Sequence, residues 1–284
     1  LGPSIVHQLE ARGNPVMCIH RSGVHVSNGT AIAADRNSCD DLKRIFRKFD
    51  SFTLIDMIPY TARQAAILVE ALEGKQPNFV AVSSIDVYQA YNNLHSQGKP
   101  LNTVQKVPLF ETSELRSRIS FQGIEYDKLN VERIYWSYFD SCTILRMPAI
   151  FGLPDTSRVE RYFNSLKNGQ EIVMNSGHAA WRFSRSLNAN CAHAVVLSVN
   201  TSRREVFNVA EENHHSEMEW CSLIANILGV EANIRIDASA PTPFSMNTQQ
   251  HWTVSSSKIR AELGYTEKYC IESGIKAVLA QLDR

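Results

Sequence analysis

Short apolar runs alternate with amphipathic segments along the first half of the chain. Four runs are apolar at nearly every position: Asn14–Arg21, Ser51–Ile58, Pro77–Ser84 and Ser141–Pro148. Strands covered on both faces of a parallel sheet have this pattern. The intervening segments repeat apolar residues at helical spacing: Ser4–Arg12, Asp40–Lys48, Ala62–Leu72 and Glu125–Phe139. The alternation predicts an α/β fold with a doubly wound parallel sheet, which binds ligands beyond the carboxyl ends of its strands.

The second half of the chain has shorter elements. A strand is expected at Glu205–Ala210, and helices are expected at Met218–Leu228, Ser256–Leu263 and Ile271–Gln281. We therefore predict a first domain over residues 1–150 and a smaller C-terminal lobe over residues 151–284. Residues 205–210 are candidates to return to the main sheet.

Composition narrows the class of protein. Hydrophobic residues make up 44 % and charged residues 20 %, and the 29 basic residues balance the 29 acidic ones. This balance favours neither a nucleic-acid partner nor an anionic membrane surface. The six cysteines are widely spread without a C-x-x-C pair, which indicates reduced thiols rather than a zinc site or a disulfide framework. We expect a soluble cytoplasmic protein without a metal centre.

Five short motifs occur in a consistent order along the chain. They are "SSIDVY" (Ser83–Tyr88), the Lys128-x-x-x-Glu132 pair, "LRMPAIFG" (Leu145–Gly152), "FNVA" (Phe207–Ala210) and "SSSKIRAELGY" (Ser255–Tyr265). Together they resemble the extended short-chain dehydrogenase/reductase family, and within it the NAD-dependent epimerase/dehydratase group. The resemblance covers essentially the whole chain and implies a Rossmann-like fold. It constrains the reaction less, because one fold hosts many activities.

The resemblance implies a set of residues around a nicotinamide dinucleotide. Gly2 would let the backbone approach the pyrophosphate, and Asp35 would hydrogen-bond the adenine edge. The other cofactor contacts it implies are Arg36, Ile58, Pro59, Ser83, Lys128 and Pro148. Arg21 stands where NAD-selecting members carry an acidic residue, and a guanidinium suits the 2′-phosphate of NADP. The expected cofactor is NAD or NADP with NADP slightly favoured, although a solvated loop arginine is nearly as good an interpretation of Arg21.

The start of the chain differs from what such a sheet requires. A dinucleotide-binding sheet places a strand and a glycine-rich turn before its first helix, because the pyrophosphate binds at that helix N-terminus. Here Gly2 leads directly into an amphipathic segment. We expect about ten further residues, one strand and most of a turn, before Leu1 in the natural protein.

The proton-transfer residue is the main open question of the sequence. The family places a tyrosine four residues before Lys128, where this chain has Ile124, and its nearest tyrosine is Tyr126. On the expected helix Tyr126 lies about 200° from Lys128, so we expect Lys128 to point toward the cofactor ribose and Tyr126 to point away from it. The resemblance still implies that Ser84 orients the reacting oxygen and that Lys128 binds the nicotinamide ribose. The candidates for the missing acid or base are Tyr126, Glu125, Asp86, Tyr88, Tyr91 and His95. The alternative is a reaction that needs only hydride positioning, with the proton carried by the substrate.

The second lobe is expected to hold the substrate. Trp181, Arg182 and Arg185 lie where relatives recognise sugar nucleotides, and Arg158 precedes a helix nearby. Arginines suit diphosphates and tryptophan suits base stacking, but a surface loop with an apolar anchor explains the segment equally well. Two functions stay open. One is an NAD(P)-dependent epimerase, dehydratase or reductase acting on a sugar nucleotide or related small molecule, compatible with a homodimer. The other is a catalytically silent dinucleotide-binding sensor or scaffold.

Overall fold

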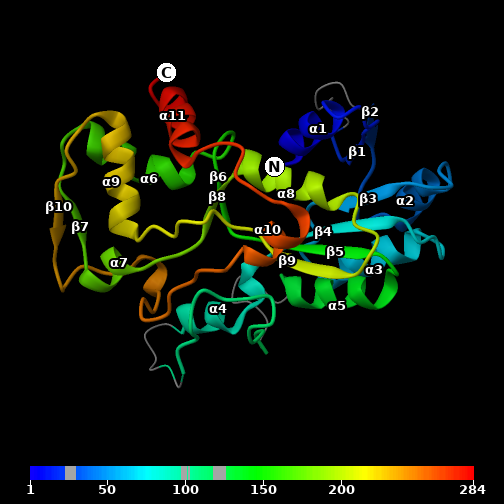
Figure 1. Cartoon of the computed structure of the whole chain (residues 1–284), viewed down its shortest axis with the longest axis horizontal. Coiled ribbons are helices and arrows are strands. Elements are labelled where there is room, and N and C mark those ends of the chain that lie inside the picture. Colours follow the sequence, from blue (N-terminus) through cyan, green and yellow to red (C-terminus); the bar gives the residue numbers. More distant parts are fainter. Residues whose placement is uncertain (23–29, 97–100, 102, 118–125) are drawn as a thin grey trace.

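The computed structural model of the chain describes residues 1–22, 30–96, 101, 103–117 and 126–284 (Figure 1). Ile124 and Glu125, which bear on the predicted proton transfer, lie outside the described residues.

The main sheet is parallel and has the order β3-β4-β5-β9. Its strands are β3 (Thr53–Asp56), β4 (Asn78–Ser84), β5 (Cys142–Met147) and β9 (Glu205–Asn208). Strand β5 is buried at every position, and β4 is buried at all but its two end positions, as the continuous apolar runs predict. Strand β9 pairs with β5, with Glu205 opposite Thr143 and Asn208 opposite Arg146. A strand from the second half of the chain therefore belongs to the main sheet.

Three further parallel pairs accompany this sheet. Strands β1 (Met17–His20) and β2 (Thr30–Ala33) form one, β6 (Ala149–Phe151) and β8 (Arg185–Leu187) the second, and β7 (Ile172–Met174) and β10 (Ile234–Ile236) the third. Among the described residues, β1 pairs only with β2 and β3 only with β4. The additional strand expected before Leu1 stays a prediction.

Helices cover both faces of the main sheet (Figure 1). On one face, α1 (Gly2–Glu10) and α8 (Asn188–Ser198) pack with Val80, Val82 and Leu145. On the other, α2 (Cys39–Phe46), α3 (Ala62–Ala71) and α5 (Lys128–Tyr138) pack with Phe79 and Ile144. The fold is therefore the doubly wound α/β fold that the alternation predicted. Helix α8 was not among the predicted helices, because it is buried on nearly every side and lacks an amphipathic period.

A separate apolar core forms in the second half of the chain. It lies among α6 (Ser157–Lys167), α7 (Ser176–Ala180), α9 (Glu217–Leu228) and α11 (Ile271–Leu282), and Phe151 and Trp220 pack edge to face within it. The Ser216 side chain accepts a hydrogen bond from the Glu219 backbone while the Glu219 side chain accepts one from Ser216, a capping box that begins α9.

The remaining elements are short. They are η1 (Ile85–Val87), α4 (Gln89–Leu94), η2 (Pro243–Ser245) and α10 (Ser257–Leu263). Within the described ranges, no helix has the length and apolar character needed to cross a membrane.

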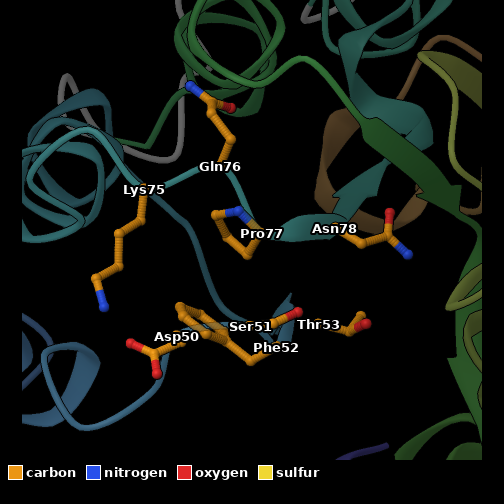
Figure 2. A pocket seen from close by; sticks show the side chains of 8 residues that line it. All are labelled: Asp50, Ser51, Phe52, Thr53, Lys75, Gln76, Pro77 and Asn78. Carbon is orange, nitrogen blue, oxygen red and sulfur yellow. The ribbon is translucent and has the colours of Figure 1, made fainter.

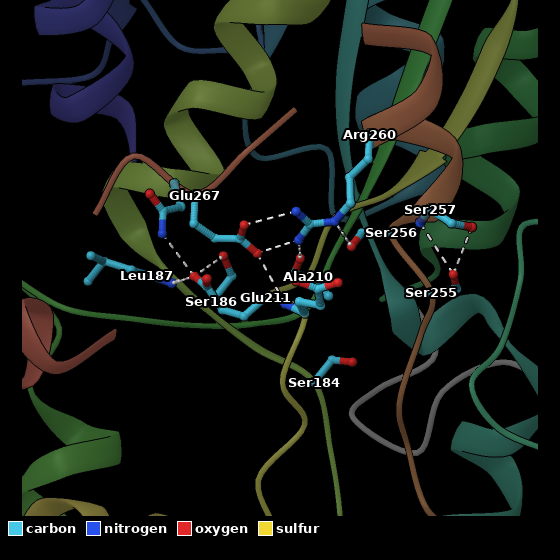
Figure 3. A network of polar contacts seen from close by, with 12 residues as sticks. Ser184, Ser186, Leu187, Ala210, Glu211, Ser255, Ser256, Ser257, Arg260 and Glu267 are labelled. Atoms are coloured by element: carbon cyan, nitrogen blue, oxygen red, sulfur yellow. Dashed lines mark hydrogen bonds and ion pairs between the residues drawn. The ribbon is translucent and has the colours of Figure 1, made fainter. Parts of the chain in front are cut away.

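A buried carboxylate fastens the segment after β9 to the neighbouring elements (Figure 3). Glu211 accepts hydrogen bonds from the Ser186 hydroxyl, the Leu187 backbone and the Asn190 amide. Nearby, Arg260 of α10 pairs with Glu267 through both of its terminal nitrogens. The network fixes the end of β9 against the start of α8.

Candidate active site

The carboxyl end of β4 opens the candidate site. There the Ser84 hydroxyl accepts a hydrogen bond from the Asp86 backbone at 3.3 Å and caps the short turn η1. This turn brings the Asp86 side chain into the interior, where the residue is only 4 % exposed. Ligands of parallel α/β sheets bind at this edge, so the position suits a reacting group.

Helix α5 begins later than the sequence pattern predicts. Its first residue is Lys128, and Asp127 is its N-cap. The prediction that Tyr126 and Lys128 lie on opposite faces of one helix is therefore wrong, because Tyr126 precedes the first turn and its direction is not set by helical spacing. The Asp127 carboxylate bonds the backbone amides of Leu129 and Asn130, which fixes the start of the helix at this point.

Tyr126 and Lys128 converge on the same small region. The Tyr126 hydroxyl donates a hydrogen bond to Asp86 Oδ2 at 2.6 Å. The Tyr126 ring lies 5.9 Å from the Tyr60 ring, and Lys128 Nζ lies 4.9 Å from the centre of that same Tyr60 ring. Lys128 also donates to the carbonyl oxygen of Val82 at 3.1 Å. A phenol, a carboxylate and an ammonium group thus meet beside Ser84.

Burial shifts the pKa values of all three groups. Desolvation lowers the pKa of Lys128 to about 8, because the low-dielectric surroundings disfavour its charge. Desolvation likewise raises the pKa of Asp86, although Tyr126, Arg116 and Lys128 act in the opposite direction. The pKa of Tyr126 is raised by burial and by the adjacent Asp86 carboxylate. Perturbed groups gathered at a strand end are typical of functional sites.

A buried ion pair supports the start of α5. The Arg116 guanidinium is almost fully buried and bonds Asp127 at 3.1 Å. Asp127 thereby serves two purposes, since it caps the helix and balances a buried charge. Its backbone amide also bonds the carbonyl oxygen of Tyr60, which holds the Tyr60 loop against Lys128.

Ser83 and Glu132 belong to a second polar network beneath the site. The Ser83 hydroxyl bonds Glu132 at 2.5 Å, and Glu132 forms a buried two-point pair with Arg146. This network joins β4, α5 and β5. The structure therefore places Ser83, a predicted cofactor contact, in interactions that position the scaffold.

The other proton-transfer candidates differ in their surroundings. The Tyr88 hydroxyl bonds Asn208 and receives a hydrogen bond from Arg146, and burial raises its pKa to about 12. Tyr91 is buried against the rings of His95 and Trp252, and burial lowers the pKa of His95 to about 4. Asp86 and Tyr126, in contrast, are joined by a hydrogen bond at the carboxyl end of β4.

The N-terminus of α1 lies beyond the carboxyl ends of the strands. Asn188 Nδ2 bonds both the Ser4 hydroxyl and the carbonyl oxygen of Leu153, which follows β5 and β6 in the chain. Backbone N–H groups at a helix N-terminus suit the pyrophosphate of a dinucleotide, and α1 begins with Gly2, so this part of the structure fits the implied cofactor.

Asp35 is better placed than Arg36 to contact a cofactor. Asp35 Oδ1 accepts from the backbone and side chain of Asn37, and within the described part of the chain no hydrogen bond to its second oxygen competes with a ligand. Arg36 instead makes a two-point ion pair with Asp56 at 2.8 and 3.0 Å, and Asp56 also accepts from the Tyr135 hydroxyl. The sequence does not reveal this pairing, because Arg36 and Asp56 come together only in the fold.

The remaining implied cofactor contacts lie at strand ends. Ile58 is exposed while Pro59 is buried after β3, and Pro148 is buried between β5 and β6. Arg21 is exposed in the turn after β1. The structure thus leaves the Ile58 and Arg21 side chains accessible to a ligand.

The predicted substrate residues do not form one recognition surface. Trp181 is 4 % exposed, stacks on Phe183 and donates its indole N–H to the carbonyl oxygen of Gln250, so a base has no open face to stack on. Arg185 is buried and bonds Glu217 at 2.5 Å. Arg182 pairs at the surface with Glu219 through both terminal nitrogens.

Arg158 completes the predicted substrate set. It lies within α6 rather than before it, and its Nε bonds the carbonyl oxygen of Ile150. Arg182 and Arg185 both have carboxylate partners in the fold, which reduces their value for binding diphosphates.

A pocket of about 340 Å³ lies away from this site (Figure 2). It is lined by residues at the amino ends of β3 and β4, including Thr53 and Asn78, and by Lys75. The Lys75 ammonium already bonds the carbonyl oxygens of Phe46 and Phe49. The pocket therefore lies at the sheet edge opposite to the one where parallel α/β sheets bind ligands.

The sequence interpretation missed three contributors to the site: Tyr60, Arg116 and Asp127. Asp is a preferred N-cap residue, so Asp127 carried a signal that could have located the start of α5. Tyr60 follows Ile58 and Pro59 directly, where a cofactor-lining segment was expected. No sequence pattern pointed to Arg116.

Comparison with known proteins establishes the fold. No family model matches the chain, and no curated protein matches its sequence. Among solved structures, the UDP-N-acetylglucosamine 4-epimerase from Bacillus cereus is 15 % identical with a TM-score of 0.70, covering 100 % of this chain and 95 % of its own. The UDP-glucose 4-epimerase from Thermotoga maritima, solved with UDP-glucose, is 16 % identical with a TM-score of 0.72, covering 99 % and 95 %.

A third structure is a dTDP-glucose 4,6-dehydratase from Bacillus anthracis in complex with NAD. It is 12 % identical with a TM-score of 0.72, covering 99 % of this chain and 93 % of its own. Likeness at these identities extends over the whole chain but speaks for architecture alone. The chain therefore has the Rossmann-like α/β fold that nucleotide-sugar epimerases and dehydratases share.

Proposed function

We propose that the protein is a nicotinamide-dinucleotide-dependent oxidoreductase of the epimerase/dehydratase type that acts on a nucleotide sugar. The observation that carries this proposal is the meeting of Ser84, Lys128 and the Asp86–Tyr126 pair at the carboxyl end of β4. The shared fold with proteins named for nucleotide sugars supports the substrate class. The ionisable cluster favours an enzyme over a silent sensor or scaffold, since a binding protein does not require it.

The cofactor would lie between the α1 N-terminus and Lys128. The backbone at Gly2 and Ser4 would bind the pyrophosphate, and Asp35 would accept a hydrogen bond from the adenine. Lys128 would donate to the ribose next to the nicotinamide, because Val82 takes only one of its three N–H donors among the described residues. A bound nicotinamide supplies a reversible hydride acceptor.

Ser84 would orient the reacting hydroxyl or carbonyl oxygen of the sugar. Its own hydroxyl accepts from the Asp86 backbone and also interacts with the Asp86 carboxylate, so the Ser84 proton would turn from Asp86 to donate toward a substrate oxygen. A hydrogen bond to a carbonyl oxygen favours hydride return to the carbon. Lys128 adds positive charge on the same side of the site, which stabilises negative charge that develops on that oxygen.

Dinucleotide binding and turnover test the proposal directly. Calorimetry with NAD and with NADP is expected to show binding, and mass spectrometry is expected to show conversion of UDP-glucose, UDP-N-acetylglucosamine or dTDP-glucose in the presence of the bound dinucleotide. No binding of either dinucleotide at millimolar concentration would overturn the proposal. Binding without conversion of any nucleotide sugar would instead favour the sensor or scaffold.

The choice between the two dinucleotides depends on Arg21 in this proposal. The exposed guanidinium after β1 would pair with the 2′-phosphate, so NADP is expected to bind somewhat more tightly than NAD. Arg21→Ala should equalise the two affinities. If the unmodified protein does not discriminate between them, Arg21 has no such role.

A further inference from the structure

The Asp86–Tyr126 hydrogen bond is unusual in its surroundings. Asp86 is almost completely buried, yet it lies next to a strand end where a ligand would bind. Its Oδ2 accepts a hydrogen bond from the Tyr126 hydroxyl, with 2.6 Å between the two oxygens, and its buried Oδ1 has no hydrogen-bond partner among the described residues. A buried carboxylate normally has all of its oxygens satisfied, so a half-satisfied one suggests a group kept ready to take up a proton.

The charges that face Asp86 do not fully compensate its burial. Tyr126 donates to it from the segment before α5, Lys128 faces it from the start of that helix, and Arg116 faces it from the loop that precedes the undescribed residues. Desolvation outweighs these three contributions and that of the Ser84 side chain, which also favours the charged form, so the pKa of Asp86 is raised. The carboxylate is therefore a stronger base than one at the surface.

Tyr126 has the complementary property. Burial and the facing Asp86 carboxylate raise the pKa of its phenol, with smaller contributions from Tyr91 and Tyr60. A phenol of this kind does not exist as the phenolate near neutral pH. It can accept a proton on its oxygen only if it gives up its own proton in the same step.

We propose that Tyr126 and Asp86 form a two-residue proton relay for the oxidation and reduction of a substrate hydroxyl group. This inference rests on the proposed function and assigns the proton transfer within it. In oxidation, the substrate O–H bond breaks and its proton passes to Tyr126 Oη, while the Tyr126 proton passes to Asp86 Oδ2. The alcohol carbon gives up its hydrogen with two electrons to the oxidised dinucleotide, and a carbonyl group forms. Reduction runs through the same atoms in the reverse direction and returns the Asp86 proton.

The relay explains how the site works without a phenol at position 124. Tyr126 reaches the site because α5 starts only at Lys128, so the preceding segment approaches Asp86 without helical constraint. The half-buried Tyr126 side chain keeps part of its surface open to a ligand. Asp86 contacts no substrate in this scheme and acts through Tyr126 as the final proton acceptor.

Tyr126→Phe tests the relay in turnover. The variant keeps the ring contact with Tyr60 but removes the hydroxyl, so kcat is expected to fall by about 100-fold to 10,000-fold, the usual contribution of a positioned acid or base. Dinucleotide affinity is expected to stay unchanged. Tyr138→Phe, which removes a hydroxyl from the far end of α5, the helix that follows Tyr126, is the matched control and should keep full turnover.

Titration of the cofactor-free protein gives a readout that is independent of turnover. With isotope-labelled aspartate carboxyl carbons, NMR is expected to show one aspartate that protonates above the ordinary range and whose signal is absent in Asp86→Asn. In Tyr126→Phe its pKa should rise further, because the lost hydrogen bond stabilised the charged form. Asp140→Asn, at an exposed position after α5, should leave this signal in place.

The outcomes separate the relay from the function on which it rests. Full kcat in Tyr126→Phe, or an Asp86 signal that titrates in the ordinary range, overturns the relay while dinucleotide binding and turnover uphold the proposed function. Failure of the unmodified protein to bind any dinucleotide overturns the proposed function and the relay together. A drop in kcat in Tyr126→Phe together with the raised Asp86 signal supports both.

Discussion

Lys128 shows how burial gives a common residue a special property. An exposed lysine on a helix keeps its charge at every physiological pH, but desolvation brings the pKa of this one to about 8. The carboxylates of Asp86, Asp56 and Glu132 favour its charge, while Arg36 opposes it. The ammonium form therefore predominates below about pH 8 and is lost as the pH rises through that value.

We expect Lys128→Ala to weaken dinucleotide binding. Loss of charge-assisted hydrogen bonds to the ribose corresponds to roughly 1.5–3 kcal/mol. In the unmodified protein, affinity should be highest below the pKa of Lys128 and should fall as the pH rises through about 8. Calorimetry over a series of pH values measures both effects.

Lys167→Ala is the control for this measurement, because Lys167 is an exposed lysine of α6 paired with Asp283. The dinucleotide affinity of Lys167→Ala should vary with pH in the same way as that of the unmodified protein. A flat profile in the unmodified protein, or a Lys128→Ala variant that binds equally well, would show that Lys128 does not contact the cofactor.

Among the elements, the start of α5 has the greatest consequence for the site. Asp127 holds the first turn through Leu129 and Asn130 and holds Arg116 through an ion pair. If the helix began one turn earlier, Tyr126 would be part of it and its hydroxyl would be directed by helical spacing. The cap thus decides whether the phenol can reach Asp86.

We expect Asp127→Ala to destabilise the protein by about 3–5 kcal/mol, the usual cost of breaking a buried ion pair. Asp127→Asn keeps a capping oxygen and removes only the charge. The difference in stability between the two variants therefore measures the contribution of the cap, expected to be about 0.5–2 kcal/mol. Urea unfolding of both variants measures the difference. If Asp127→Asn is as stable as the unmodified protein while Asp127→Ala loses only about 0.5–2 kcal/mol, the Arg116 pair contributes little and the cap is the main role of Asp127.

At the scale of the whole molecule, a buried ion pair joins β8 to the second core. Arg185 contacts Glu217 of α9 at 2.5 Å and lies over the rings of Phe183 and Trp220. Glu217 also accepts a hydrogen bond from Tyr162 of α6. Three elements from different parts of the chain therefore depend on one carboxylate.

Glu217→Gln should lower the free energy of unfolding by about 3–5 kcal/mol, because it leaves the buried Arg185 charge without its counterion. Glu219→Gln is the matched change on the same helix. This change weakens the exposed ion pair between Glu219 and Arg182, but the glutamine amide can still complete the capping box with Ser216. The free energy of unfolding should therefore fall by at most about 1 kcal/mol. Equal losses in the two variants would contradict a special role for the buried pair.

The apolar pattern of the sequence determined much of the architecture. Runs such as Pro77–Ser84 and Ser141–Pro148 became the buried strands β4 and β5, because continuous apolar residues are stable only where both faces of a strand are covered. Ser84 ends the apolar run of β4, so the sequence placed it at the carboxyl end of that strand. In the structure Lys128 bonds the carbonyl oxygen of Val82 near the same end. Strand β2 is as short as the predicted β1 and β3, so its length does not explain why it was missed, whereas helix α8 was missed because it lacks a polar face.

Only the tertiary structure decided the partners of the charged and polar side chains. Tyr126 and Asp86 are 40 residues apart, and Arg36 and Asp56 are 20 apart, so no local spacing predicts that they meet. The burial of Trp181 was also decided by the tertiary structure, because the sequence around it fits an exposed substrate-binding loop and a loop with a buried apolar anchor equally well. Apolar periodicity reports which face of an element is covered, whereas hydrogen bonds and ion pairs depend on which side chains the packed elements bring within about 3 Å of one another.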